Sequence, residues 1–411
     1  MRRSWTELAA ESIAGIHASA GFTLVELSVA SLILMATISA ALSVARLAQD
    51  MFDVQPEHSD VQQRIRVSAD VLRRDLLMAG AGTYAGPAMG PLTDVMAPVM
   101  PYRAFGDTPD PRQGILFRPD VVSLAYVPAT ASQSTLASEL PAGALDVQIA
   151  AAPNCPPATA TTLCGFEAGA HLLIVDAVGH WDVFSVQGIA VGGLRVGHRG
   201  TAAAAYPTGA AVSEARFVTY SLKLDASTGV SQLTRHDGWV TESPVVDNVV
   251  AMRFTYFGAA APPRLIPDPL SASEPIPTYG PKPPLLGQMQ DGWPPGENCL
   301  FQVSDGVQVP RLPALDAAMP VVELAPSLFT DGPWCPDSTA PNPYDADLLR
   351  VRSVRVTLRV QSAIASLRGP ASALFLKGGT ARGGARYVPD LEVQFDVTPR
   401  NLNLPSWRGR P

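Results

Sequence analysis

Residues 21–45 read GFTLVELSVASLILMATISAALSVA, and this segment sets the expectation for the whole chain. From Phe22 to Ala45 it holds a single charged residue, Glu26. As an α-helix with a rise of about 1.5 Å per residue it would be about 36 Å long, which exceeds the roughly 30 Å hydrocarbon core of a bilayer. The segment therefore predicts a membrane-spanning helix over residues 22–45.

The flanking residues predict how this helix crosses the membrane. Arg2 and Arg3 precede the apolar segment, and no other Lys or Arg follows until Arg46. Because Lys and Arg near a span stay on the cytoplasmic side, we expect a cytoplasmic N-terminus and an exported C-terminal part. A conventional secretory signal has its apolar run before the cleavage site. Here the A-x-A-like triplet at 18–20 comes before the apolar run, so the order is inverted.

The hexapeptide Gly21-Phe22-Thr23-Leu24-Val25-Glu26 resembles the GFTLxE signal of type IV prepilins, and all of its residues match. The resemblance implies that a prepilin peptidase cuts between Gly21 and Phe22 and then methylates the new terminal amine of Phe22. Residues 1–21 would be the leader peptide.

Glu26 is unusual by its chemistry as well. A carboxylate in an apolar helix costs about 2.5–3.5 kcal/mol at the bilayer centre and less near an end, so an intramembrane acid is a candidate functional residue. The resemblance implies that Glu26 pairs with the α-amino group of Phe22 on a neighbouring subunit and sets the register of assembly. The alternative is an acid tolerated at the membrane interface.

Beyond residue 45 the helical pattern continues. A stripe of residues recurs at spacings of three and four up to the helix-stop residue Gly80, after an expected interruption at Asp53–Pro56. The stripe consists of Val61, Ile65, Ser68, Leu72, Leu76 and Ala79.

Strand signals dominate after Gly80, and Thr228-Gly229 lies between two alternating segments as in a β-hairpin. The candidate strands are Val121–Val127, His171–Asp176, Trp181–Val186, Ala211–Leu224, Gly229–His236, Val245–Phe257, Leu348–Val360 and Leu391–Val397. In Leu348–Val360, alternation of valines with arginines predicts one solvated face.

These patterns and the resemblance predict an α+β, pilin-like fold: a long N-terminal helix, membrane-embedded in its first half, packed on an antiparallel β-sheet. The chain would divide into the leader (1–21), a transmembrane and filament-core helix (22–45), its amphipathic continuation (46–80) and a β-rich globular domain (81–411). Proline-rich insertions are expected at about 86–112 and 258–345.

Several weaker motifs resemble PilW-like minor pilins. They are Arg66–Gly82, Val245–Phe257, Leu348–Val360 and the ending Thr398–Leu402. The resemblance implies a minor pilin that acts at the pilus tip or in the priming complex, with roles in motility, adhesion or DNA uptake. Its partners would be the prepilin peptidase, other minor pilins, the major pilin and the inner-membrane assembly platform. It would reside in the inner membrane with a periplasmic C-terminal domain and then in the extracellular pilus. The alternatives are a J-type minor pseudopilin of type II secretion and a tip adhesin or ligand-binding pilin subunit.

The four cysteines predict disulfides in an exported domain. Pairing of sequence neighbours, Cys155 with Cys164 and Cys299 with Cys335, closes the least costly loops, although other connectivities stay open. A zinc site with His171 and His180 fits none of the usual ligand spacings. Oxygen ligands for Ca²⁺ at Asn342, Asp345 and Asp347 match no EF-hand loop.

Composition narrows the class of function further. The formal net charge of −7 does not support nucleic-acid binding by a basic surface. No G-x-S-x-G nucleophile motif occurs, and the glycines at 80–86 follow a helix instead of joining a strand to one. We therefore expect no catalytic residues, metal or cofactor, and no enzymatic activity.

Overall fold

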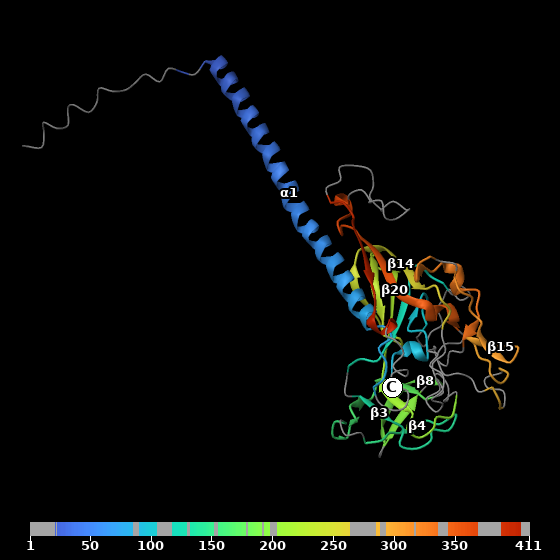
Figure 1. Ribbon diagram of the computed structural model, residues 1–411. Helices are drawn as coiled ribbons and strands as arrows, with labels where there is room; N and C mark the ends of the chain where they lie inside the picture. The colour runs from blue at the N-terminus through green and yellow to red at the C-terminus, as the bar shows by residue number, and fades with distance from the viewer. Residues whose placement is uncertain are drawn as a thin grey trace, which may run out of the picture. The chain divides into compact units, whose positions relative to one another are not determined.

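The computed structural model describes residues 21, 23–84, 90–104, 117–129, 132–151, 155–177, 180–190, 193–197, 204–263, 285–287, 293–315, 318–335, 344–368 and 388–403. Within 46–53, only the side chain of Phe52 is described. The chain forms two compact units, Met1–Pro56 and Glu57–Pro411 (Figure 1).

The one long helix, α1, runs from Leu24 to Met78 and passes through Pro56. The predicted helical region is therefore confirmed, but the predicted interruption at Asp53–Pro56 is wrong. Proline removes one N–H donor and its ring crowds the carbonyl four residues back, but this local cost does not end the helix here. Glu57, the next residue, is buried and accepts hydrogen bonds from Arg64 and from the backbone N–H of Ala363.

In the first unit, Leu24–Ala45 has a mean hydropathy of 2.1 and is exposed throughout. By length and composition this segment is able to cross a membrane. In the second unit, the end of α1 buries Val61, Ser68, Leu72, Leu76 and Ala79, and Ile65 is half-buried. The predicted apolar stripe is confirmed.

The described strands of the second unit form three larger antiparallel sheets. The five-stranded sheet has the order β1 (Val99–Met100), β2 (Val122–Tyr126), β11 (Arg216–Leu224), β12 (Ser231–His236), β13 (Glu242–Asp247). The six-stranded sheet has the order β3 (Gln133–Thr135), β10 (Ala211–Glu214), β7 (His171–Val175), β8 (Trp181–Ala190), β9 (Gly193–Gly197), β4 (Asp146–Gln148). The four-stranded sheet has the order β17 (Val321–Glu323), β14 (Val249–Ala259), β20 (Val351–Val360), β21 (Leu391–Val397).

Short ribbons and 3₁₀ helices complete the described elements. The ribbons pair β5 (Thr162–Leu163) with β6 (Phe166–Glu167), β15 (Phe301–Ser304) with β16 (Val307–Pro310), and β18 (Trp334–Cys335) with β19 (Tyr344–Asp345). The 3₁₀ helices are η1 (Leu92–Asp94), η2 (Pro326–Phe329), η3 (Ala346–Arg350), η4 (Ala365–Leu367) and η5 (Arg400–Leu402).

The predicted fold class, a long helix packed on one antiparallel sheet, is contradicted. The globular part is mostly β, and its strands belong to several sheets. The segment Ala211–Leu224, expected as one strand, divides at Ala215: β10 pairs with β3 and β7, whereas β11 pairs with β2 and β12. The six-stranded sheet also encloses its own apolar cluster, which includes Val147, Phe184, Leu194 and Val212. A second core of this kind needs a second sheet to build it.

Candidate functional site

The N-terminal turn of α1 carries the residues that the sequence singled out. The carbonyl of Thr23 accepts the first helical hydrogen bond, from Leu27, so Thr23 is the N-cap. Its backbone N–H and its hydroxyl each donate to Oε2 of Glu26 at 2.9 Å, and Glu26 N–H donates back to the Thr23 hydroxyl at 3.2 Å. This is a capping box, in which a Thr at the N-cap and a Glu three residues later satisfy two helix-end donors reciprocally.

The other site residues of this segment are placed only in part. Gly21 is exposed, and a Cβ added to it would meet no atom within 4 Å. Phe22, the expected methylation site, lies outside the described residues. The capping role of Glu26 was not foreseen, although the T-x-x-E spacing of Thr23 and Glu26 signals it directly.

Four of the five hydroxyl side chains within Leu24–Ala45 bond to their own helix. Ser28 donates to Leu24 O, Ser31 to Leu27 O, Thr37 to Leu34 O and Ser43 to Ser39 O, at 2.6–2.8 Å. Hydroxyls that bond a carbonyl one turn back need no water, and polar groups must meet this condition inside a bilayer.

The buried end of α1 holds a polar cluster around Asp75, which we call the Asp75 cluster: Asp75, Tyr126, Tyr220 and Arg235. Tyr126 OH donates to Oδ1 of Asp75 at 3.1 Å; Tyr220 OH and Arg235 Nε donate to Oδ2 at 2.6 and 3.2 Å. The three donors lie on β2, β11 and β12, so one carboxylate fixes the helix to three adjacent strands of the five-stranded sheet.

Burial, followed by the charge of Asp75, raises the pKa of Tyr126 to about 12 and also raises that of Tyr220. Both phenols therefore stay protonated and remain donors over the physiological range. Sequence reasoning missed this cluster, but Asp75 follows Ser68 and Leu72 at helical spacing on the buried stripe, which was the available signal.

The cysteines pair as expected, Cys155 with Cys164 and Cys299 with Cys335, with Cα–Cα distances of 4.4 and 4.9 Å. Cys164 is buried in the apolar cluster of the six-stranded sheet. Oxidised cysteines offer no thiolate, so the zinc arrangement with His171 and His180 is not built. His180 instead lies 2.9 Å from Oδ2 of Asp176, through its Nδ1.

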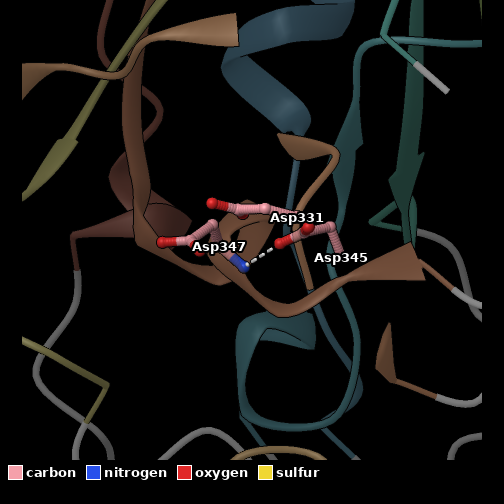
Figure 2. A group of neighbouring side chains, drawn as sticks. All are labelled: Asp331, Asp345 and Asp347. Carbon is pink, nitrogen blue, oxygen red and sulfur yellow. Dashed lines mark hydrogen bonds between the residues drawn. The ribbon is translucent and has the colours of Figure 1, made fainter. Parts of the chain in front are cut away.

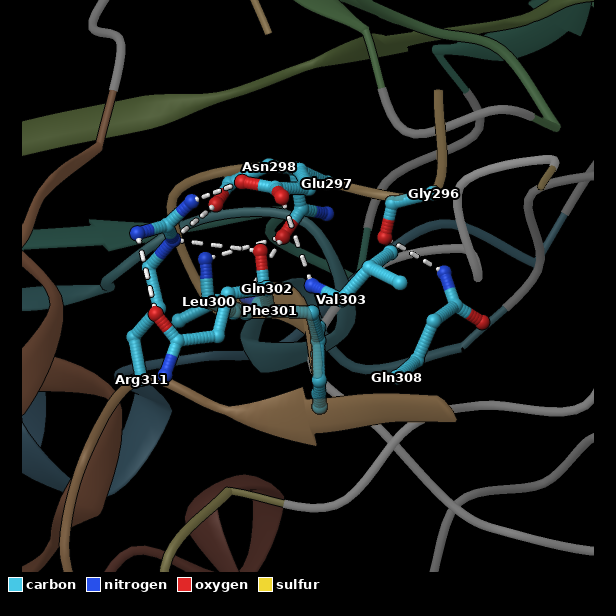
Figure 3. Close-up of polar contacts among 9 residues, drawn as sticks. All are labelled: Gly296, Glu297, Asn298, Leu300, Phe301, Gln302, Val303, Gln308 and Arg311. Atoms are coloured by element: carbon cyan, nitrogen blue, oxygen red, sulfur yellow. Dashed lines mark hydrogen bonds and ion pairs between the residues drawn. The ribbon is translucent and has the colours of Figure 1, made fainter. Parts of the chain in front are cut away.

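The second disulfide closes a segment with a dense polar network, shown in Figure 3. Oδ1 of Asn298 accepts from the N–H groups of Leu300 and Phe301, and Nε of Arg311 donates to the carbonyls of Asn298 and Phe301. Arg311 also pairs with Glu297, and its guanidinium lies 4.5 Å from the ring centre of Trp293. These contacts hold a fixed conformation around the β15–β16 ribbon.

Asp331, Asp345 and Asp347 bring ligand oxygens within 4.8 Å of one another (Figure 2), and we call them the Asp345 cluster. Asp345 and Asp347 are buried, and Asp331 is exposed. Half of the six carboxylate oxygens already have protein donors: Asp345 accepts from the N–H groups of Asp347 and Gly332, and Asp347 pairs with Arg350. Among the described residues it is the only such group of acids, cysteines or histidines. A divalent cation is the ligand that this chemistry would hold.

Burial, helped by the charges of Asp347 and Asp331 and opposed by the two N–H donors, raises the pKa of Asp345 to about 6. Burial likewise raises the pKa of Asp347 to about 6, although Arg350 opposes the shift. The sequence offered Asn342 together with Asp345 and Asp347 as oxygen ligands for Ca²⁺, but Asn342 lies outside the described residues.

No model of a known protein family matches the chain, and no curated protein matches it at a significant level.

Proposed function

We propose that this chain is a minor pilin of a type IV pilus, processed by a prepilin peptidase and assembled with other minor pilins at the tip or in the priming complex. One observation carries the proposal: the prepilin-like hexapeptide 21–26 leads without interruption into the exposed apolar helix Leu24–Ala45. A secretory signal has the opposite order of apolar run and cleavage site.

Two further features of the N-terminal unit support this role. The apolar side chains of Leu24–Ala45 are exposed, so an apolar environment outside this chain has to cover them: the membrane first, then the helices of other subunits. The hydroxyls of Ser28, Ser31, Thr37 and Ser43 are already satisfied by the helix, which makes either environment tolerable for them. The proposal places the second unit in the periplasm and later on the pilus surface, where disulfides persist.

Processing is the first test. In a host with the prepilin peptidase, intact-mass analysis should find a chain that begins at N-methylated Phe22 and lacks residues 1–21. Gly21→Val should leave the precursor uncut, and this variant creates no clash because the space around Gly21 is open. Ala20→Val, its control, should be cut normally. A wild-type chain that begins at Gly21, or that keeps its first 21 residues, contradicts the assignment.

Glu26→Gln isolates the charge of Glu26, because Gln at this position keeps the capping box. We expect normal cleavage but at least a tenfold loss of co-purifying pilins, since the terminal amine of a neighbouring subunit then lacks a carboxylate inside the membrane. If Glu26→Gln co-purified with as many partner pilins as the wild type does, Glu26 would act only as part of the helix cap.

A further inference from the structure

A polar cleft of about 450 Å³ lies where the five-stranded and six-stranded sheets meet. Its charged and polar lining comes from the β6–β7 turn, the start of β7, the β10–β11 junction and β12 with the residues after it. These groups are Glu167, His171, Glu214, Arg216, Arg235 and Asp237. The volume is in the range of small-molecule sites.

The charges of this cleft are largely compensated within the protein. Glu214 pairs with Arg216 at 3.0 Å, and Arg235 is held by Asp75 of the Asp75 cluster. Oδ1 of Asp237 accepts from the N–H groups of Trp239, Val240 and Thr241 at 2.8–3.1 Å. An ionic ligand would have to break such pairs, whereas a neutral polar ligand could add hydrogen bonds to them.

Close packing around the cleft holds its lining in one geometry. A Cβ added to Gly238 would lie 2.4 Å from Cβ of Phe217, so the turn after β12 sits directly on β11. The ring of His171 lies 5.2 Å from that of Trp239 and 6.4 Å from that of Phe217. Gly169 leaves open space where another residue would place a side chain. Fixed groups reduce the entropy lost when a ligand binds.

We propose that this cleft binds a neutral saccharide of one or two rings. A sugar hydroxyl both donates and accepts, so adjacent hydroxyls match a surface that alternates carboxylates, which only accept, with guanidinium groups, which only donate. The ring of His171, which lies beside those of Trp239 and Phe217, adds a flat aromatic group to the lining, against which a sugar ring can pack. This inference does not depend on the proposed pilin role, because it concerns the globular unit alone.

The test uses the full chain in phosphocholine micelles, because detergents with sugar headgroups would compete. Saturation-transfer NMR and calorimetry with maltose, cellobiose, lactose and N-acetylglucosamine should detect at least one ligand. Ala168→Trp fills the cleft from an exposed position in the β6–β7 turn and should weaken that binding at least tenfold. Ala226→Trp, on the exposed turn after β11, is the matched control and should bind as the wild type does.

A second variant, Glu167→Ala, removes an exposed carboxylate at the cleft and should weaken binding several-fold with an unchanged melting temperature. Absence of binding by all four sugars overturns the proposal. So does sugar binding that Ala168→Trp leaves intact. Binding of the zwitterion glycylglycine, but of none of the four sugars, would also overturn the proposal and would indicate a peptide ligand instead. A failure in these assays leaves the processing test untouched, so the two proposals can fail separately.

Discussion

The Asp75 cluster and the Asp345 cluster both bury carboxylates in the globular unit, but their neighbours differ. Asp75 is surrounded by donors: two phenols and a guanidinium. Asp345 and Asp347 have Asp331 as a neighbour, and their donors are two backbone N–H groups and Arg350. Burial raises the pKa of both acids in the second cluster to about 6. Burial of a carboxylate therefore strengthens the fold where donors surround it, and creates a titratable site where other acids do.

The largest effect should come from removing the carboxylate of the Asp75 cluster. Asp75→Ala leaves the part-exposed Arg235 and two buried phenols without their acceptor, and each buried donor left unsatisfied costs about 1–3 kcal/mol. Urea unfolding of the full chain in micelles, followed by far-UV circular dichroism, measures the loss. Asp70→Ala, at an exposed position five residues earlier in α1, is the control and should change the free energy of unfolding by less than about 0.5 kcal/mol. Equal losses in both variants would show that Asp75 does not fix the helix to the sheet.

A smaller loss is expected from a single donor of the same cluster. Tyr220→Phe removes the hydroxyl that donates to Oδ2 of Asp75 at 2.6 Å. A hydrogen bond to a charged group contributes about 1.5–3 kcal/mol, so the variant should lie between wild type and Asp75→Ala. In the background of Asp75→Ala the same change should cost much less, and this double-mutant cycle measures the coupling. Tyr84→Phe, on a half-exposed tyrosine, serves as the control; additive losses for Tyr220 and Asp75 would contradict the cluster.

The helix and most of the longer strands were predictable because they depend on local periodicity, whereas short strands such as β3, β4 and β17 were not predicted. α1 ends within two residues of the expected Ala79, and β21 has the predicted bounds Leu391–Val397. The hairpin at Thr228-Gly229 joins β11 to β12 as expected. Hydrophobic spacing reports which residues face a core, and that information lies within a few residues of sequence.

The assembly of strands into sheets was not predictable in the same way. Val245–Phe257 looked like one strand, but it divides at Asn248, which has φ of 62°, into β13 of the five-stranded sheet and β14 of the four-stranded sheet. No apolar pattern marks this change of partner, because both parts keep the alternation of a strand. Asn tolerates the left-handed region better than most residues, and this was the weak available signal.

Charged residues misled the interpretation of one strand face. Alternation in β20 predicted a solvated face bearing Arg355, Thr357 and Arg359, yet Thr357 and Arg359 are buried. Arg359 pairs with Glu392 on the neighbouring β21, and both side chains are at most 3% exposed. The partner lies 33 residues away along the chain, so a single-sequence pattern could not find it. Asp75 was missed for the same reason, since its three donors lie on strands that are distant along the chain.

The smallest effect should come from Asp331 of the Asp345 cluster, and it tests the other half of the comparison. Asp331→Asn removes an exposed charge that raises the pKa of both Asp345 and Asp347. An acid whose folded pKa is raised contributes stability below its unfolded pKa near 3.8, and this contribution is lost as the pH rises through about 6. Without the charge of Asp331 the folded pKa values of Asp345 and Asp347 should be lower. The loss of stability then ends at a lower pH and is smaller, so the variant should be more stable than the wild type at pH 7. Because Asp331 is exposed, the gain should be less than about 1 kcal/mol.

The effect of Asp331→Asn has to be measured as the difference between the variant and the wild type. Other acids of the chain change the stability with pH in the opposite direction. Hydrogen bonds to Lys223 and Thr234 lower the pKa of Glu242 even though burial raises it, so the stability from Glu242 is lost as the pH falls. Subtracting the wild-type melting temperature from that of Asp331→Asn at each pH between 4 and 7 cancels these contributions. The difference should be near zero at pH 4, where Asp345 and Asp347 are mostly protonated, and should rise toward pH 7. Asp305→Asn, in the exposed β15–β16 turn where Asn also accepts a positive φ, should give a flat difference curve. A flat curve for Asp331→Asn as well would mean that the charge of Asp331 does not act on the buried pair, whose raised pKa values would then come from burial and, for Asp345, from the charge of Asp347.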